Sequence, residues 1–317
     1  MILNRYIPGC WALLSLALLG SGCSINRMAV NAVADALTGE GGSEVFTADS
    51  DPELVGDAIP FAIKMYESLL SQAPDHQGLI LTTGSLFVMY ANAFVQGPAE
   101  FLPPIQYEER EAAMKRAKML YLRGAGILQG GLEKKYPGIG ESSAESGTMA
   151  PYLAKMKKGE VPLLYWTAAA YLSAYSLDPF DFPLSHKVAD AMAFIDRAYA
   201  LDPDFNRGAL DDFYVLALAS LPDTMGGDLS RVETHFSRSL EKSGGLLAGS
   251  YVSYAQAVAV PAQDYGVFKK HLETALALDA DADPPNRLVN IISQRKARAL
   301  LDNAGNFFIL LDDEEYE

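Results

Sequence analysis

The chain has 317 residues, of which 40 are acidic and 25 are basic, and its formal net charge is −15. A surface this acidic repels nucleic acid and disfavours direct adhesion to anionic lipid, so nucleic-acid-binding proteins are excluded as a class. The length and the 50% share of hydrophobic residues suffice for one sizeable core.

Residues 1–22 have the pattern of a secretory signal peptide, with a charge at Arg5, the apolar run "WALLSLALL" and small residues before Cys23. The stretch "LLGSGCS" resembles a bacterial lipobox, whose cysteine is acylated and becomes the new N-terminus, although Gly20 stands where a leucine is expected. We therefore predict a lipoprotein signal peptide and lipidation at Cys23. A plain signal peptide or an uncleaved anchor is the alternative. Cleavage would remove Cys10, so the mature chain would form no intrachain disulfide.

The rest of the chain divides into three predicted regions. Residues 23–50 contain "TGEGGSE" and are predicted to form the lipidated N-terminus and a tether, although "NRMAVNAVADAL" within them has the composition of a short helix. Residues 51–303 show helical periodicity, punctuated by proline and glycine, and no convincing strand, which predicts one helical domain. Residues 304–317 end in "LDDEEYE" and are predicted to be an acidic tail.

A short spacing pattern recurs within the predicted domain. Ala191, Ile195 and Ala198 share one helix face, and Pro203 ends the run because proline cannot donate the next helical hydrogen bond. The same spacing of four, three and five residues recurs, with varying fidelity, at Ala62-Tyr66-Leu69-Pro74, Val232-Phe236-Ser239-Gly244, Phe268-Leu272-Ala275-Ala280 and Ala117-Tyr121-Gly124-Gln129.

Small residues at these positions let neighbouring helices approach closely, as in the helical hairpins of tetratricopeptide repeats. The pattern predicts an all-α fold in which degenerate tetratricopeptide-like hairpins form one compact helical-repeat domain. An irregular helical bundle is the alternative.

Two predicted helices carry no charge, "QGLILTTGSLFVMYANAFVQ" at 77–96 and "VPLLYWTAAAYLSAYSL" at 161–177. Polar residues dilute the first, and proline and tyrosines interrupt the second, so helices buried at the centre of the domain fit better than membrane spans. Buried tyrosines need hydrogen-bond partners or a cavity that holds water. Plain core packing and a ligand channel lined by Phe87, Tyr90, Trp166 and Tyr171 therefore both stay open.

No catalytic or metal-binding motif is visible. The four histidines stand far apart, and none has a short metal-ligand spacing to another histidine, cysteine or glutamate. No nucleophile elbow, Walker loop or dinucleotide fingerprint is present. Asp211 and Asp212 are adjacent on a predicted helix and point apart, which favours a solvated face. We therefore predict a protein that is not an enzyme and has no cofactor or metal.

Several stretches together resemble the TRAP transporter T-component family. The most specific pieces are Tyr165-Trp166, Gly226-Gly227-Asp228, His235-Phe236 and Asn290. They lie within "VPLLYWTAAA", "MAFIDRAYALDPDFNRGAL", "MGGDLSRVETHFSRSLEKSGG", "YVSYAQAVAVPAQDYGVFKKHLETALALD" and "NRLVNIISQRKARALLDN". The resemblance implies a periplasmic lipoprotein of tetratricopeptide-like fold that is associated with a tripartite ATP-independent periplasmic transporter.

Two functions follow as hypotheses. In the first, the chain is anchored to a bacterial membrane through N-terminal acyl chains, docks the transporter's solute-binding protein and shelters or passes a small, largely apolar ligand with an acidic group. Arg287, Asn290 and Arg298 on the last helix are further candidate cavity residues, and the two arginines are the basic residues expected to meet that acid. In the second, the chain is a scaffold for another envelope complex and binds no small ligand. A homo-oligomer is compatible with both.

Overall fold

The computed structural model describes residues 28–39 and 44–309, and within these ranges the chain is helical and contains no strand. The all-α prediction is therefore confirmed. The first helix described is Met28–Thr38. The remaining α-helices are α2 (Glu44–Thr47), α3 (Pro52–Gln72), α4 (Gln77–Tyr90), α5 (Gly97–Glu100), α6 (Tyr107–Lys135), α7 (Ala150–Leu153), α8 (Val161–Leu177), α9 (Phe182–Leu201), α10 (Ala209–Ser220), α11 (Leu229–Ser243), α12 (Ala248–Tyr254), α13 (Tyr265–Ala277) and α14 (Arg287–Asp302).

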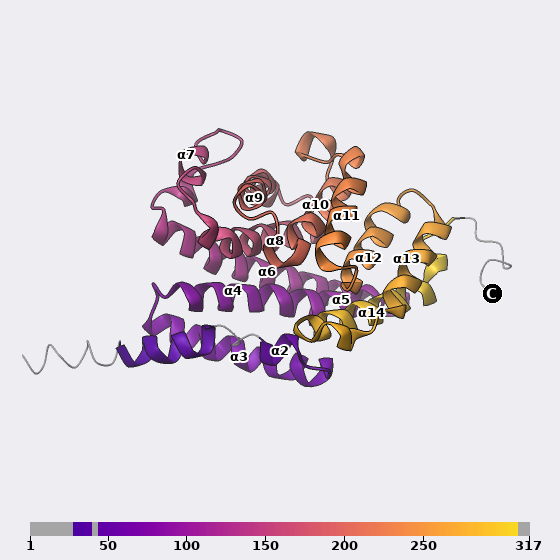
Figure 1. The fold of residues 1–317 in the computed structure, drawn as a ribbon, viewed down its shortest axis with the longest axis horizontal. Coiled ribbons are helices and arrows are strands. Elements are labelled where there is room, and N and C mark those ends of the chain that lie inside the picture. Colours follow the sequence, from indigo (N-terminus) through magenta and orange to yellow (C-terminus); the bar gives the residue numbers. More distant parts are fainter. Residues whose placement is uncertain (1–27, 40–43, 310–317) are drawn as a thin grey trace, which may run out of the picture.

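Helices that follow one another in the chain also pack on one another. α3 lies at the lower side of Figure 1, α4 covers it, α6 and α8 come next, and α9 lies at the top. The second half continues with α10 against α11, then α12, α13 and α14. α14 returns to α2 and α3, and Arg295 on α14 makes an ion pair with Glu53 on α3. The last helix therefore contacts α2 and α3, near the beginning of the described chain.

Aspartates set the starts of four helices. The Asp51, Asp181 and Asp264 carboxylates accept hydrogen bonds from the backbone N–H groups of residues 54, 184 and 267, at 2.9–3.2 Å. Asp228 accepts in the same way from Ser230 N–H at 3.1 Å. Each bond satisfies a donor that the first helical turn leaves unpaired, so these residues fix where α3, α9, α11 and α13 begin.

The recurrent spacing marks the buried side of the helices. Ala191, Ile195 and Ala198 are fully buried on α9, as are Phe268, Leu272 and Ala275 on α13. The first three positions of the other copies are also buried, except for Leu69, which is partly buried. The pattern therefore predicted the packed faces correctly, whereas a specifically tetratricopeptide-like geometry stays a prediction.

The two uncharged segments lie at the centre of the domain. α4 runs on through a π-helical turn, Ala91–Gln96, into α5, and this run of 24 residues from Gln77 is apolar and long enough to cross a membrane by composition. However, 56% of its most apolar stretch is buried inside the domain. α8 packs between α6 and α9, with Leu164, Ala168 and Ala174 fully buried. Burial within the fold explains the lack of charge in both segments.

The packed part of the chain extends beyond the limits of 51 and 303 that the sequence suggested. The helix Met28–Thr38 lies in the predicted tether, yet Ala34 is fully buried and the Tyr66 hydroxyl donates to the Leu37 carbonyl at 3.2 Å. Phe308 lies in the predicted tail and packs with Phe268 at 4.9 Å between ring centroids. Cys23, the signal peptide and residues 310–317 lie outside the described residues.

Candidate functional site

Phe87 and Tyr90, two of the predicted cavity residues, lie on α4 in different surroundings. Phe87 is buried, and the Arg123 guanidinium stands 4.9 Å from its ring centroid. Tyr90 is partly buried, stacks on Phe94 at 5.9 Å and has Arg116 5.6 Å from its ring. Both rings therefore already have protein partners from α6 or from the turn after α4.

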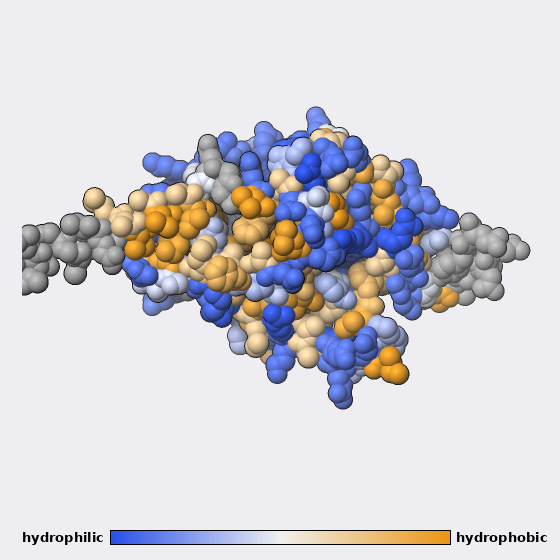
Figure 2. Space-filling view, turned by 90° about the horizontal axis from the view of Figure 1, so that it is seen from below, coloured by the Kyte–Doolittle hydropathy of each residue, from blue (hydrophilic) through white to orange (hydrophobic). Residues whose placement is uncertain are grey.

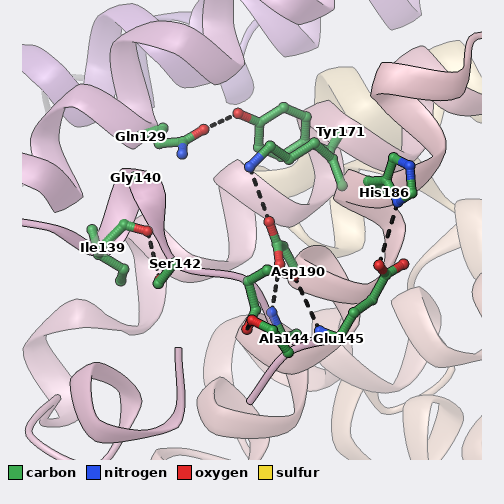
Figure 3. A network of polar contacts seen from close by, with 12 residues as sticks. Gln129, Ile139, Gly140, Ser142, Ala144, Glu145, Tyr171, His186 and Asp190 are labelled. Carbon is green, nitrogen blue, oxygen red and sulfur yellow. Dashed lines mark hydrogen bonds and ion pairs between the residues drawn. The ribbon is translucent and has the colours of Figure 1, made fainter. Parts of the chain in front are cut away.

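Trp166 and Tyr171 lie on α8. Tyr171 is buried and donates its hydroxyl hydrogen bond to the Gln129 side chain of α6 (Figure 3). Burial, with the Asp190 carboxylate nearby, raises the pKa of Tyr171 to about 12. Trp166 is partly buried and makes an edge contact with Tyr165, with ring centroids 5.2 Å apart.

Asp190, on α9, holds the loop that comes after α6, as Figure 3 shows. Its carboxylate accepts from the Ala144 backbone N–H at 2.8 Å and pairs with Lys187 at 3.0 Å. His186 lies 3.3 Å from the Glu145 carboxylate in the same region. These contacts hold a glycine- and serine-rich segment in one conformation.

The three predicted residues of α14 also differ in their surroundings. Asn290 is fully buried, accepts from Ala248 N–H and donates to the Leu246 carbonyl, both at 2.9 Å. Arg287 donates to the Ala48 carbonyl at 3.0 Å and pairs with Asp281 at 2.6 Å. Arg298 is exposed. Asn290 thus fixes the start of α12, and a shared cavity with the aromatic residues of α4 and α8 stays a prediction.

A small cavity of about 150 Å³ lies between the starts of α4 and α8 and the end of α6. An ion pair between Lys135 and Glu160 stands in its wall. The cavity is lined by Gln77, Gly78, Leu81, Lys135, Gly159, Glu160 and Leu163. None of the predicted cavity residues belongs to this lining.

The densest buried polar cluster among the described residues surrounds α10, and it was not foreseen. Asp211 is fully buried. It meets His235 Nδ1 at 2.8 Å, Lys242 Nζ at 2.7 Å and the Tyr199 hydroxyl at 3.2 Å. Burial favours a raised pKa for Asp211, but the hydrogen bonds from His235 and Lys242 outweigh it and hold the pKa below its ordinary value.

Asp212 points to a different set of partners. The hydroxyls of Ser239 on α11 and Ser250 on α12 donate to its carboxylate at 2.6 and 2.9 Å. Burial without a cation raises the pKa of Asp212 to about 6. We call Tyr199, Asp211, Asp212, His235, Ser239, Lys242 and Ser250 the α10 cluster. Because its members come from α9, α10, α11 and α12, it ties four consecutive helices together.

An aromatic group adjoins the α10 cluster. Tyr165 has its ring centroid 5.4 Å from that of Phe205 and 6.4 Å from that of Phe213. Burial, with the Asp212 carboxylate nearby, raises the pKa of Tyr165 to about 12. Among the described residues, the Tyr165 side chain therefore makes ring contacts with Trp166, Phe205 and Phe213.

The α10 cluster lacks the arrangement of a hydrolase or a metal site. His235 bonds to Asp211 while the two serines bond to Asp212, so neither serine is positioned for activation by a histidine. In the part of the chain that the structure describes, no three histidine, cysteine or acidic side chains gather as a metal site would require. The cluster therefore organises the helices and the adjoining aromatic group.

The interpretation of Asp211 and Asp212 as a solvated face was wrong. They do point apart, as adjacent helical residues must, but both meet donors from neighbouring helices. One signal was available in the sequence: these are the only charges in "GALDDFYVLALAS", residues 208–220. Two acids within an otherwise apolar helix indicate burial with partners.

The stability of the Asp212→Asn protein is expected to depend less on pH between 4.5 and 8 than that of the wild-type protein. The folded-state pKa of about 6 lies above the ordinary value of 3.8, so the stabilisation is complete below about pH 4 and lost as the pH rises through 6. The two pKa values correspond to at most about 3 kcal/mol. Asparagine keeps an acceptor for both serine hydroxyls.

Thermal melts of wild type and variant at several pH values measure this difference. Asp211 acts in the opposite sense but outside this range, because its lowered pKa costs stability only below about pH 4. Parallel pH profiles for the two proteins would show that Asp212 is ionised in the fold throughout.

The residues Gly226, Gly227 and Asp228, which are part of the family resemblance, form the turn before α11. Gly226 has a φ of 101°, which favours glycine, and Asp228 caps α11. A Cβ on Gly227 would lie 1.9 Å from the Leu221 carbonyl oxygen. Both glycines are thus required by the backbone, and this turn is structural.

Comparison with known proteins shows which family the chain belongs to. A protein of Treponema pallidum (strain Nichols), described only as uncharacterized, is 33% identical over 314 residues, which is 95% of this chain and 97% of that protein. The family model "TRAP transporter T-component" matches residues 48–308. This match spans the helices from α3 to α14 and includes the α10 cluster, Asn290 and the Gly226–Asp228 turn. The chain belongs to the TRAP transporter T-component family.

Proposed function

We propose that this protein is a lipid-anchored, periplasmic accessory component that docks the solute-binding protein of a TRAP-type transporter. Its family consists of transporter components that work at the cell envelope and is not a known enzyme class. The signal pattern before Cys23 supports export and acylation. A scaffold for another envelope complex is the alternative.

Two exposed phenylalanines at the start of α9 are the proposed docking residues. Phe180 and Phe182 are 88% and 78% exposed, which is unusual for aromatic side chains on a protein surface. Met119 on α6 is also exposed, and Lys118 beside it bonds to Asp178 and Asp181 at 2.8 and 2.7 Å. These ion pairs hold the α8–α9 turn against α6.

Rigid exposed aromatic residues are the usual anchors of protein interfaces, because they bury a large area and lose little conformational entropy. The turn is fixed from both sides, since Asp181 also caps α9. The high exposure of the two rings is the observation that carries the docking proposal. The proposed partner is a soluble solute-binding protein, because the chain belongs to a family of TRAP transporter components.

The double variant Phe180→Ser with Phe182→Ser is expected to weaken binding of the solute-binding protein encoded beside the transporter permease by tenfold or more, roughly the loss of one interface hot spot. Binding is measured by pull-down and calorimetry. The melting temperature is expected to stay unchanged, because both side chains are exposed.

Leu229→Ser is the matched control, since Leu229 is exposed and apolar at the start of α11. If the double variant binds as tightly as wild type, the solute-binding protein docks on another face of the domain. No binding by wild type at tens of micromolar would favour the envelope scaffold.

Ligand handling is the second part of the proposal. A small, largely apolar ligand with an acidic group would contact Phe87, Tyr90, Trp166, Tyr171, Arg287 or Arg298. The partly buried Trp166, whose ring contacts that of Tyr165, supports α8 as the place where such a ligand meets the protein.

A further inference from the structure

The helix Met28–Thr38 is apolar on both of its sides. Its inner side, Val30, Ala34 and Leu37, packs on α3 and α4. Its outer side consists of the exposed residues Ala29, Ala32, Val33 and Ala36. A helix on the surface of a soluble protein normally turns several charged residues outward, whereas Asp35 is the one charged residue of this helix and lies beside this outer side.

The single charged side chain within this helix is occupied by another contact. Asp35 is exposed, and its carboxylate lies 3.0 Å from His76 Nε2 at the start of α4. The helix is held in place by this contact and by the bond from the Tyr66 hydroxyl to the Leu37 carbonyl. Its uncharged outer side is therefore a fixed surface of the domain.

Exposed apolar side chains also occur on the neighbouring helices α2 and α3, among exposed charged residues such as Glu53, Asp57 and Lys64. In Figure 1 the helix lies at the lower side of the molecule together with α2 and α3. Exposed apolar side chains on these elements are Met28, Val33, Val45, Leu54 and Phe61, which are 49–75% exposed. Figure 2, seen from below, shows hydrophobic colours over the end of the molecule where this helix begins.

The distance to the predicted anchor identifies what covers this surface. Met28 follows Cys23 by 28 − 23 = 5 residues. Five residues of extended chain reach at most about 17 Å, which is close to the length of the helix itself. If acyl chains on Cys23 enter the bilayer, the start of the helix must stay near the headgroups.

We propose that the outer side of the helix Met28–Thr38 lies on the lipid bilayer and holds the domain in a fixed orientation. This inference rests on the proposed acylation of Cys23. The acyl chains supply attachment, and the apolar helix side supplies contact at the depth of the interface. Because the protein carries a net charge of −15, contact is apolar and independent of anionic lipid.

Spin labels on introduced cysteines test the contact in the full, acylated chain. The natural cysteines are Cys10 and Cys23, so a label on Val33→Cys or Ala29→Cys occupies the sole free thiol after processing. The control is Leu229→Cys on α11, because Leu229 is also an exposed apolar residue. The protein is placed in phosphatidylcholine vesicles, with and without phosphatidylglycerol.

At positions 29 and 33 we expect contact with dissolved oxygen to exceed contact with a water-soluble nickel reagent by about threefold relative to position 229, in both lipid mixtures. Equal ratios at all three positions would overturn the proposal. Spin-spin broadening at position 33 that disappears on dilution with unlabelled protein would also overturn it, because a second copy would then cover the helix.

Metabolic labelling with a fatty acid separates this inference from its premise. Label that is present in wild type and lost in Cys23→Ala supports acylation. The spin-label result then tests only whether the helix Met28–Thr38 contacts the bilayer. Absence of label from wild type contradicts the anchoring and overturns the membrane contact with it.

Discussion

Asp211→Ala is expected to destabilise the protein by about 3 kcal/mol or more. Asp211 is fully buried and holds His235, Lys242 and Tyr199 in place, so its removal leaves three polar groups without their shared acceptor. Loss of one partner from a buried ion pair typically costs about 3–5 kcal/mol. The lower end applies here, because Lys242 keeps its bond to the Pro203 carbonyl at 2.6 Å.

Chemical denaturation followed by circular dichroism measures this loss. Asp204→Asn is the matched control, since Asp204 approaches the same Lys242 at 3.5 Å but is 79% exposed. Its effect is expected to stay within about 0.5 kcal/mol, as for other exposed ion pairs. Asp211→Asn should lie between the two, because it keeps an acceptor and loses the charge. Equal stability of the Asp211→Ala and Asp204→Asn proteins would mean that the cluster contributes nothing to the fold.

The α10 cluster shows where a sequence ceases to predict a structure. The helices and their buried faces follow from local spacing, and the aspartate caps follow from side-chain chemistry at helix starts. Contacts such as that of Asp211 with Lys242, 31 residues apart, depend on how the helices pack. Periodicity says nothing about that arrangement, so the adjacent carboxylates were interpreted as solvated.

Asn290 is a second residue whose partners depend on how the helices pack. As a polar residue on the last helix it suggested a ligand contact, but its amide joins the backbone at Leu246 and Ala248. A polar side chain that suits a ligand also suits an unpaired backbone group, and only the fold decides between them. Cys23 and the signal peptide stay predictions of the sequence.

The two proposed surfaces lie on different parts of the fold. The helix Met28–Thr38 is at the lower side of Figure 1 with α3, whereas α9 lies above α8, beyond α4 and α6. In a domain that rests on the bilayer through the lower side, α4, α6 and α8 would separate α9 from the membrane. Both proposals together therefore describe one orientation, in which a soluble partner approaches from the periplasm.

Ala198→Trp is expected to destabilise the protein by roughly 3 kcal/mol or more, because even added methylenes in a packed core typically cost about 1–3 kcal/mol. Ala198 is fully buried on α9, in the hydrophobic cluster that contains Leu164 and Ala168 of α8. An indole at this position forces α9 away from its neighbours, since rotation about the side-chain bonds finds no free space.

The control for this substitution must be an exposed residue of the same helix. The adjacent Arg197 is unsuitable, because it is partly buried and donates to the Ala154 and Met156 carbonyls at 3.4 and 2.5 Å. Ala200→Trp is the better control, because Ala200 lies on the same helix and is exposed. Its melting temperature is expected to stay within a few degrees of wild type. Similar destabilisation by both tryptophans would show that the cost lies in the helix itself, and close approach at the small residues would then not be what holds α9 in the fold.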